Sequence, residues 1–181
     1  MISQIPNLLT LLRIAASPVM VLLLSDRAYE AALWIFLIAG ITDGLDGYIA
    51  KRFGFQSELG AVLDPIADKL LILSAFVTLG GLGDIPLWLL ILVAFRDLLI
   101  IGGYLVLRMV EGDVQMQPTP VSKLNTFLQI SLVLTILLET TGWLDLGIFT
   151  SLVVAAVTVT SVISGVHYVW YWGIQDESKR D

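Results

Sequence analysis

The chain is too apolar for an ordinary soluble domain. Its 181 residues are 57% hydrophobic and only 14% charged, and its mean hydropathy is +0.88, whereas soluble domains average roughly 25% charged residues. The absence of cysteine excludes disulfides and thiolate metal sites. The net charge of −6 says little about partners, because membrane orientation follows the placement of Lys and Arg. We therefore predict an integral membrane protein.

Apolar segments follow one another along the whole chain. The first contains Arg13 and is not preceded by a basic stretch, so we expect a membrane helix there rather than a cleaved signal peptide. All are long enough for a bilayer that needs about 20 residues. The fold class predicted is an all-α membrane protein, one domain over residues 1–181, with six transmembrane helices near 7–25, 29–52, 57–82, 85–108, 120–141 and 144–173.

Three helix starts can be predicted from capping residues. Ser57 is placed to cap the third helix, Asp84 with Pro86 to open the fourth, and Thr119 with Pro120 to open the fifth. Small polar side chains accept hydrogen bonds from the first backbone N–H groups of a helix, and proline suits the first helical position.

Orientation follows from basic residues near the segment ends. One side carries six of them and the other carries Arg27 alone, which predicts that both termini and the mouth of the Asp43–Asp68 stretch face the cytoplasm. The six are Lys51, Arg52, Arg108, Lys123, Lys179 and Arg180. Trp143 near one boundary and aromatic residues after His167 near the other suit interfacial belts.

Charged residues also lie well inside the apolar segments. Each costs at least about 2.5 kcal/mol in lipid, so each should face a partner or a wet cavity. Arg96 and Asp97 are sequence neighbours that point in different directions on a helix, so we expect each to have a partner on another helix. Lys69 is expected to neutralise acids or to snorkel. The remaining members of this set are Arg13, Asp43, Asp46, Asp64 and Asp68.

Four of these charges form a pattern in the stretch Asp43–Asp68. On a helix, Asp43 and Asp46 share a narrow face with Gly47 and Ala50, and Asp64 and Asp68 share a face with Gly60. A hairpin that turns near residues 54–57 brings Asp43 level with Asp68 and Asp46 level with Asp64. Four carboxylates in one pocket need cations, shared protons or basic partners, and Mg²⁺ or Mn²⁺ prefers carboxylate oxygens.

This pattern resembles the signature of the CDP-alcohol phosphatidyltransferases, D-x2-D-G-x2-A-R-x8-G-x3-D-x3-D. The stretch matches seven of the eight fixed positions at the right spacing. The departure is Lys51, which stands where the family has Arg, with Arg52 directly after it. Lys cannot reproduce the planar, bidentate fork of Arg. The resemblance extends over nearly the whole chain and includes IPNLLTLLR around Asn7, Thr10 and Arg13.

The resemblance implies a six-helix, dimeric enzyme that takes CDP-diacylglycerol as phosphatidyl donor and releases CMP. It implies that Asp43, Asp46 and Asp64 bind metal, and that Asp68 ligates a second metal or acts as the base. Two Mg²⁺ or Mn²⁺ ions would neutralise charge as an alcohol attacks the pyrophosphate phosphorus. The residues that the resemblance places around CDP are Asp43, Asp46, Gly47, Ala50, Lys51, Arg52, Gly60, Asn7 and Thr10.

The acceptor is less evident. The segment PTPVSKLNTFLQI and the apolar run around Arg96 and Asp97 resemble the cardiolipin synthase branch, which implies phosphatidylglycerol. The phosphatidylglycerophosphate synthase branch, which implies glycerol 3-phosphate, shares the N-terminal stretch and the acids. Cations expected near the acceptor phosphate are Arg13, Lys69, Arg96 and Lys123.

Two further expectations complete this reading. The chain is expected in a bacterial cytoplasmic membrane, with CDP-diacylglycerol, membrane lipids and a second copy of itself as partners and with no nucleic-acid partner. An ion or proton transporter remains the alternative class, since intramembrane carboxylates also mark ion routes. Against a transporter, the acids all lie in the cytoplasmic half, and nothing comparable continues to the far side.

Overall fold

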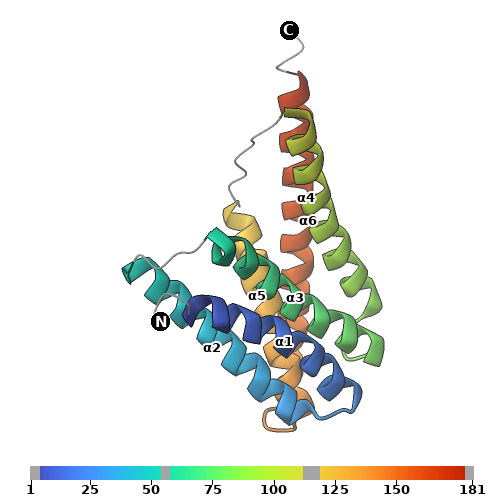
Figure 1. The fold of residues 1–181 in the computed structure, drawn as a ribbon. Helices are drawn as coiled ribbons and strands as arrows, with labels where there is room; N and C mark the ends of the chain where they lie inside the picture. The colour runs from blue at the N-terminus through green and yellow to red at the C-terminus, as the bar shows by residue number, and fades with distance from the viewer. Residues whose placement is uncertain (1–4, 54–57, 112–118, 178–181) are drawn as a thin grey trace. The chain divides into compact units, whose positions relative to one another are not determined.

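The computed structural model describes residues 5–53, 58–111 and 119–177, which are helical with short connections (Figure 1). Within these ranges, the structure does not describe the side chains of residues 5–9, 44–53, 58–66, 68, 104–105, 107–108, 110–111 and 171–177. The helices are α1 (Ile5–Ser25), α2 (Tyr29–Phe53), α3 (Glu58–Leu82), α4 (Leu87–Glu111), α5 (Pro120–Thr140) and α6 (Gly147–Glu177). The described ranges contain no strand. The all-α, six-helix prediction is therefore confirmed.

The helices group into two compact units. The first comprises residues 1–85 and 133–146, and the second comprises residues 86–132 and 147–181. Helix α5 thus contributes its C-terminal part to the first unit and its N-terminal part to the second. That both units form one domain of 1–181 stays a prediction.

In the first unit, α1 contacts both α2 and α3 (Figure 1). The contact faces follow from helical spacing, because apolar residues three or four positions apart lie on one side of a helix. Three pairs of buried apolar residues show this spacing: Met20 and Leu24 on α1, Leu33 and Phe36 on α2, and Phe76 and Leu79 on α3. These buried residues belong to the apolar core of the first unit.

Three helices of the first unit end in residues with positive φ. Gly83 follows α3 with φ of 90°, Gly142 follows α5 with φ of 72°, and Arg27 follows α1 with φ of 56°. At α1, the N–H of Arg27 bonds to the carbonyl of Leu24 at 2.8 Å, and the N–H of Ala28 bonds to that of Leu23 at 2.8 Å. This Schellman pattern usually has Gly in the left-handed position, so Arg27 holds a backbone conformation that is unfavourable for its side chain.

Of the predicted starts, Thr119 and Pro120 are confirmed. Helix α5 begins at Pro120, and the Thr119 Oγ1 accepts a hydrogen bond from the Ser122 N–H at 3.2 Å. Helix α4 begins at Leu87, directly after Pro86, while the Asp84 carboxylate accepts the Tyr29 hydroxyl at 2.8 Å. Ser57 lies outside the described residues.

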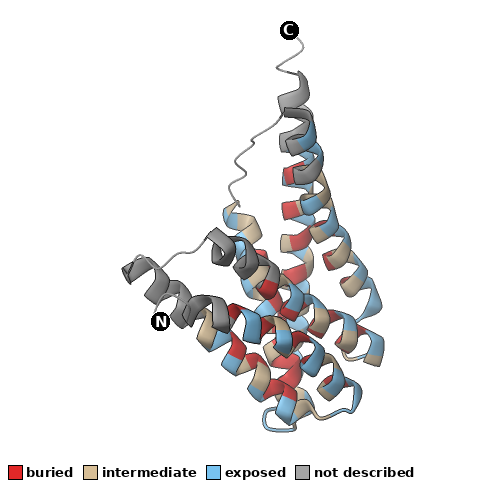
Figure 2. Ribbon diagram, in the orientation of Figure 1, coloured by how far each residue is buried: buried red, intermediate tan, exposed pale blue. Residues whose placement is uncertain are grey.

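In the second unit, α6 contacts α4 along a stripe of buried positions (Figure 2). The stripe repeats every three or four residues, and two of its members are polar. Its members are Val153, Val157, Ser161, Ser164 and Tyr168. On α4 the buried stripe likewise contains a charged residue, Arg96, one turn after Val93. Polar groups at such positions need partners, and they find them in the network described below.

Within the described residues, two helices are long and apolar enough to cross a membrane by length and composition, over Pro120–Thr140 and Gly147–Trp170. Large apolar side chains are exposed on every helix, including Leu22 (65%), Ile38 (58%) and Leu98 (69%). The prediction of six spans is not tested by these observations and stays a prediction.

Candidate active site

The signature acids occupy two helices of the first unit. Asp43 and Asp46 lie on α2, and Asp64 and Asp68 lie on α3, on either side of residues 54–57. Of the four side chains, the structure describes that of Asp43 only. That Asp43 lies level with Asp68, and Asp46 level with Asp64, therefore stays a prediction. What the structure adds is that α1 contacts both signature helices.

Helix α1 brings a buried cation to the first signature acid. Arg13 Nη1 lies 2.7 Å from Asp43 Oδ1, and the Arg13 side chain is 2% exposed whereas that of Asp43 is 41% exposed. A buried guanidinium needs a carboxylate partner, since desolvation of an unpaired charge is expensive. Arg13 was predicted near an acceptor phosphate, and the structure places it on a motif carboxylate. A carboxylate has two oxygens that can accept ligands, and the Asp43 carboxylate is accessible to solvent or to a ligand.

Other expected members of the site lie on the same helices. Thr10 is buried one turn before Arg13 on α1, so both side chains share a face of that helix. Lys69 on α3 is half-buried. Six other expected CDP-binding residues lie outside the set whose side chains are described: Asn7, Gly47, Ala50, Lys51, Arg52 and Gly60.

The donors of the signature suit a hard divalent cation. Carboxylate oxygens are the ligands that Mg²⁺ and Mn²⁺ prefer, and the half-exposed Asp43 supplies one in reach of solvent. Among the described side chains there is no group of three or more acidic or imidazole ligands. That result does not bear on the signature, since three of its four carboxylates fall outside this set.

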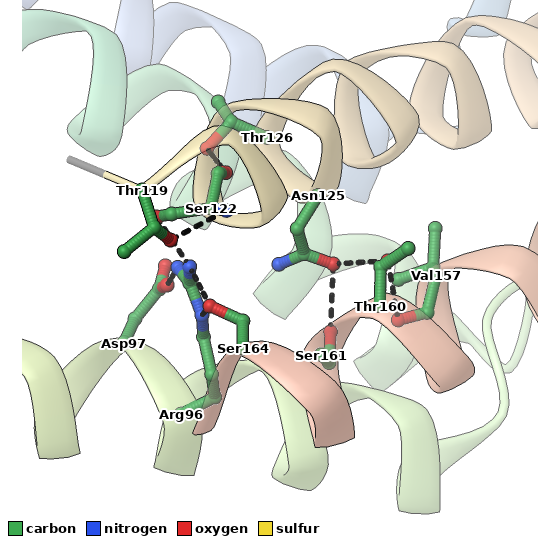
Figure 3. A network of polar contacts seen from close by, with 10 residues as sticks. All are labelled: Arg96, Asp97, Thr119, Ser122, Asn125, Thr126, Val157, Thr160, Ser161 and Ser164. Carbon is green, nitrogen blue, oxygen red and sulfur yellow. Dashed lines mark hydrogen bonds and ion pairs between the residues drawn. The ribbon is translucent and has the colours of Figure 1, made fainter. Parts of the chain in front are cut away.

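The second unit contains a buried arginine with a different environment (Figure 3). Arg96 Nη1 lies 2.6 Å from Asp97 Oδ1. Its Nη2 donates to the hydroxyls of Ser164 at 2.6 Å and of Ser122 at 2.5 Å, and its Nε also donates to Ser164, at 3.2 Å. One guanidinium therefore joins α4, α5 and α6.

The expectation of a partner on another helix is confirmed for Arg96, which donates to Ser122 on α5 and Ser164 on α6, and the structure adds an ion pair between Arg96 and its neighbour Asp97. Adjacent residues on a helix do not face each other, yet the Arg96 side chain is long enough to turn back to Asp97 while its other nitrogens reach the two serines. Asp97 thus supplies the counter-charge from the same helix. Interhelical contacts of Arg96 are made to hydroxyls.

Polar residues beside this cluster were not predicted. Asn125 Oδ1 accepts the hydroxyls of Thr160 at 2.8 Å and Ser161 at 2.9 Å (Figure 3). Asn125 Nδ2 and Gln129 Nε2 are buried and make no hydrogen bond within the described part of the chain. The signal was present in the sequence, because Ser122, Asn125 and Gln129 recur at helical spacing in an apolar run.

Lys123 and His167 lie at the surface of the second unit. Lys123 is exposed in the first turn of α5. His167 is exposed on α6, where its ring makes an edge contact with Tyr168 at 6.4 Å between centroids. An exposed position is consistent with an interfacial belt for His167.

The chain matches one protein family over most of its length. The model of the family described as CDP-alcohol phosphatidyltransferase matches residues 3–167. This span contains α1 to α5, both signature helices and most of α6.

Relatives carry two kinds of name. A "probable phosphatidylglycerophosphate synthase" of Mycobacterium tuberculosis is 38% identical over 177 residues, which cover 93% of this chain and 81% of the relative. The human "cardiolipin synthase (CMP-forming)" is 35% identical over 145 residues, covering 71% of this chain and 48% of the relative. A "CDP-diacylglycerol–glycerol-3-phosphate 3-phosphatidyltransferase" of Rickettsia bellii is 36% identical over 130 residues, covering 70% and 71%.

Proposed function

Because the chain belongs to the CDP-alcohol phosphatidyltransferase family, we propose that it transfers a phosphatidyl group from CDP-diacylglycerol to phosphatidylglycerol, forming cardiolipin and releasing CMP. The chain is a phosphatidyltransferase of phospholipid synthesis. Enzymes of the family use CDP-alcohol substrates with lipid or glycerophosphate acceptors. The proposal concerns the acceptor, the metals and the role of each residue.

We propose that Asp43, Asp46 and Asp64 hold one or two Mg²⁺ or Mn²⁺ ions and that Asp68 completes the set. Bound there, the metal would neutralise the negative charge that develops on the phosphate oxygens. Arg13 positions Asp43 through the 2.7 Å ion pair. The pair fixes one carboxylate of the set from a third helix, and this single observation carries the proposal that α1 belongs to the site.

The transfer makes one bond and breaks one bond. The acceptor hydroxyl oxygen attacks the phosphorus of the phosphatidyl group, and the bond from that phosphorus to the CMP oxygen breaks. The hydroxyl proton goes to a base, for which Asp68 is our candidate. Gly47, Ala50 and Gly60 leave room for the nucleotide beside the backbone, and Arg52 takes the phosphate contact that Lys51 makes less well.

Charge supports a monoanionic acceptor. The two buried arginines among the described residues already have carboxylate partners, Asp43 for Arg13 and Asp97 for Arg96. Glycerol 3-phosphate carries close to two negative charges and favours several converging basic groups, whereas the phosphodiester of phosphatidylglycerol carries one. The cardiolipin synthase name of the human relative agrees with this choice.

Glycerol 3-phosphate is the second candidate, for a specific reason. The mycobacterial relative that covers 93% of this chain is named a probable phosphatidylglycerophosphate synthase. With this acceptor, the same acids and the same donor would yield phosphatidylglycerophosphate.

We further propose that all six helices span a bacterial cytoplasmic membrane, that the signature faces the cytoplasm and that the enzyme is a homodimer. Members of the family are membrane enzymes. Exposed apolar side chains on every helix and the six-to-one distribution of basic residues support the first two points.

A competition assay tests the acceptor. Purified enzyme receives CDP-diacylglycerol and Mg²⁺, with phosphatidylglycerol and glycerol 3-phosphate offered together, and the lipid products are separated. Cardiolipin as the main product supports the proposal. Phosphatidylglycerophosphate as the main product contradicts the acceptor and leaves the family and the signature unchanged.

A further inference from the structure

A cavity of about 380 Å³ lies between α1 and α2 in the first unit. Its wall is apolar except near one end, where Arg13 and Thr42 contribute. Its lining residues on α1 are Leu12, Arg13, Ala15, Ala16 and Val19, and those on α2 are Ile35, Ile38, Ala39 and Thr42. We call this cavity the α1–α2 groove.

Small side chains keep the groove open. Three of its lining residues are alanines, at positions 15, 16 and 39. Packed helices normally fill such gaps with larger side chains, because protein interiors are close-packed. The groove is also reachable from outside, since Leu12 is 56% exposed, Val19 42% and Ile38 58%.

One end of the groove adjoins the signature. Arg13 lines it and forms the 2.7 Å ion pair with Asp43, the residue after Thr42. The Thr42 hydroxyl donates to the carbonyl oxygens of Ile38 at 2.8 Å and Ala39 at 2.9 Å, within its own helix. Among the described side chains, the charged groups at this end are Arg13 and Asp43, and the other lining residues apart from Thr42 are apolar.

We propose that the α1–α2 groove holds one acyl chain of the CDP-diacylglycerol donor and that Ala15, Ala16 and Ala39 determine which chains fit. This inference rests on the proposed function. The argument is one of continuity: an amphiphile whose phosphates bind at the signature acids must direct its tails away from them, and this groove leads from Asp43 into apolar surroundings open at the surface. The apolar wall of the groove can contact the methylene groups of such an acyl chain through dispersion forces.

Photo-crosslinking locates the acyl chain of the donor in the unmodified protein. The probe is CDP-diacylglycerol with a diazirine within one acyl chain, used with full-length enzyme in phosphatidylcholine vesicles and followed by peptide mass spectrometry. We expect labels on groove residues such as Leu12, Ile35 and Ile38 that excess unlabelled CDP-diacylglycerol removes. Labels confined to other helices, or to a second copy of the chain, would overturn the assignment.

Filling the groove tests the selectivity. Ala15→Trp, or Ala16→Phe if that variant does not fold, should lower kcat/KM for dioleoyl donor about tenfold, the equivalent of about 1.4 kcal/mol of lost contact. The dihexanoyl donor should change less than about twofold, because short tails need less of the groove. Leu22→Trp is the matched control, since Leu22 is 65% exposed on the same helix outside the groove.

The outcomes separate this inference from the proposed function. Equal effects of Ala15→Trp on both donors, with CMP still released, would refute the acyl-chain site alone. Absence of CMP release from any CDP-diacylglycerol by the unmodified enzyme would refute the proposed function itself. If neither filled variant folds, the crosslinked positions decide.

Discussion

Among the residues whose side chains are described, each unit has a buried arginine paired with an aspartate, and the two pairs differ in what surrounds the acid. Arg13 reaches Asp43 on another helix, and that carboxylate is 41% exposed. Arg96 reaches Asp97 on its own helix, where the carboxylate is 16% exposed, and it also donates to serines of two other helices. The first acid is accessible to a ligand, and the second lies in a largely enclosed network.

This difference in accessibility indicates that the two arginine–aspartate pairs have different roles. An ion pair with an accessible carboxylate can orient that group for a metal or substrate, as positioning groups do around metal ligands. A guanidinium that joins three helices through hydroxyls and one carboxylate fixes the packing of those helices. We therefore propose that the first pair belongs to the active site and that the second stabilises its unit.

The largest expected effect comes from replacing the aspartate of each pair by asparagine. Asp43→Asn removes a proposed metal ligand and should lower turnover by at least about a hundredfold, the scale of losing one key electrostatic group. Asp97→Asn should leave turnover per folded molecule within about threefold and lower stability instead, by about 1 to 3 kcal/mol for weakened buried hydrogen bonds. Steady-state CMP release, normalised to folded protein, measures the contrast; equal losses in both variants would contradict the assignment.

The next effect concerns the network itself. Arg96→Ala removes the guanidinium that pairs with Asp97 and donates to the buried Ser164 and the half-buried Ser122, so we expect a loss of about 2 kcal/mol in unfolding free energy. Arg96→Lys should restore only part of it, because an ammonium cannot reproduce the forked contacts. Unfolding in mixed micelles measures both variants. A stability unchanged by Arg96→Ala, combined with a large rise in the KM for acceptor, would instead make Arg96 an acceptor ligand.

A smaller effect is expected at the start of α5 in the second unit. Thr119→Ala removes the side chain that accepts the Ser122 N–H and should cost about 1 kcal/mol. Thr119→Ser keeps the acceptor and serves as the control, with little change expected in the same unfolding assay. Similar losses for both variants would show that the cap contributes little.

The smallest effect is a gain in the first unit. Arg27 occupies a left-handed position that Gly fills after α3 and α5, so Arg27→Gly should stabilise the protein by about 0.5 kcal/mol after allowing for the greater freedom of Gly when unfolded. The same substitution at exposed Lys123, inside α5, should destabilise it by up to about 1 kcal/mol. Melting temperatures of the two variants should therefore move in opposite directions.

Sequence patterns predicted the helices and one of their caps because those features are local. Apolar runs gave six helices, and Thr119 with Pro120 marked the start of α5. Gly83 and Gly142, which follow α3 and α5, are the residue type usually found with positive φ after a helix. The sequence does not indicate a positive φ at Arg27, since its conformation depends on how α1 meets α2. Local patterns were insufficient wherever tertiary contacts decide.

The arginines illustrate that limit. Spacing identified both as buried charges that need partners, but it could not show that Arg13 selects Asp43, or that Arg96 turns back to its own neighbour. Partner choice depends on side-chain reach and on the approach of other helices. The α1–α2 groove was equally unpredictable, since an alanine leaves a cavity only where no neighbour fills the space.

The most direct test of the proposed metal dependence is CMP release from CDP-diacylglycerol by enzyme stripped of divalent cations with a chelator. We predict a rate at least about a hundredfold below that of the untreated enzyme, restored by adding back Mg²⁺ or Mn²⁺ to the unmodified chain but not to Asp43→Asn. Near-normal release by the stripped enzyme would contradict the assignment of the signature acids as metal ligands.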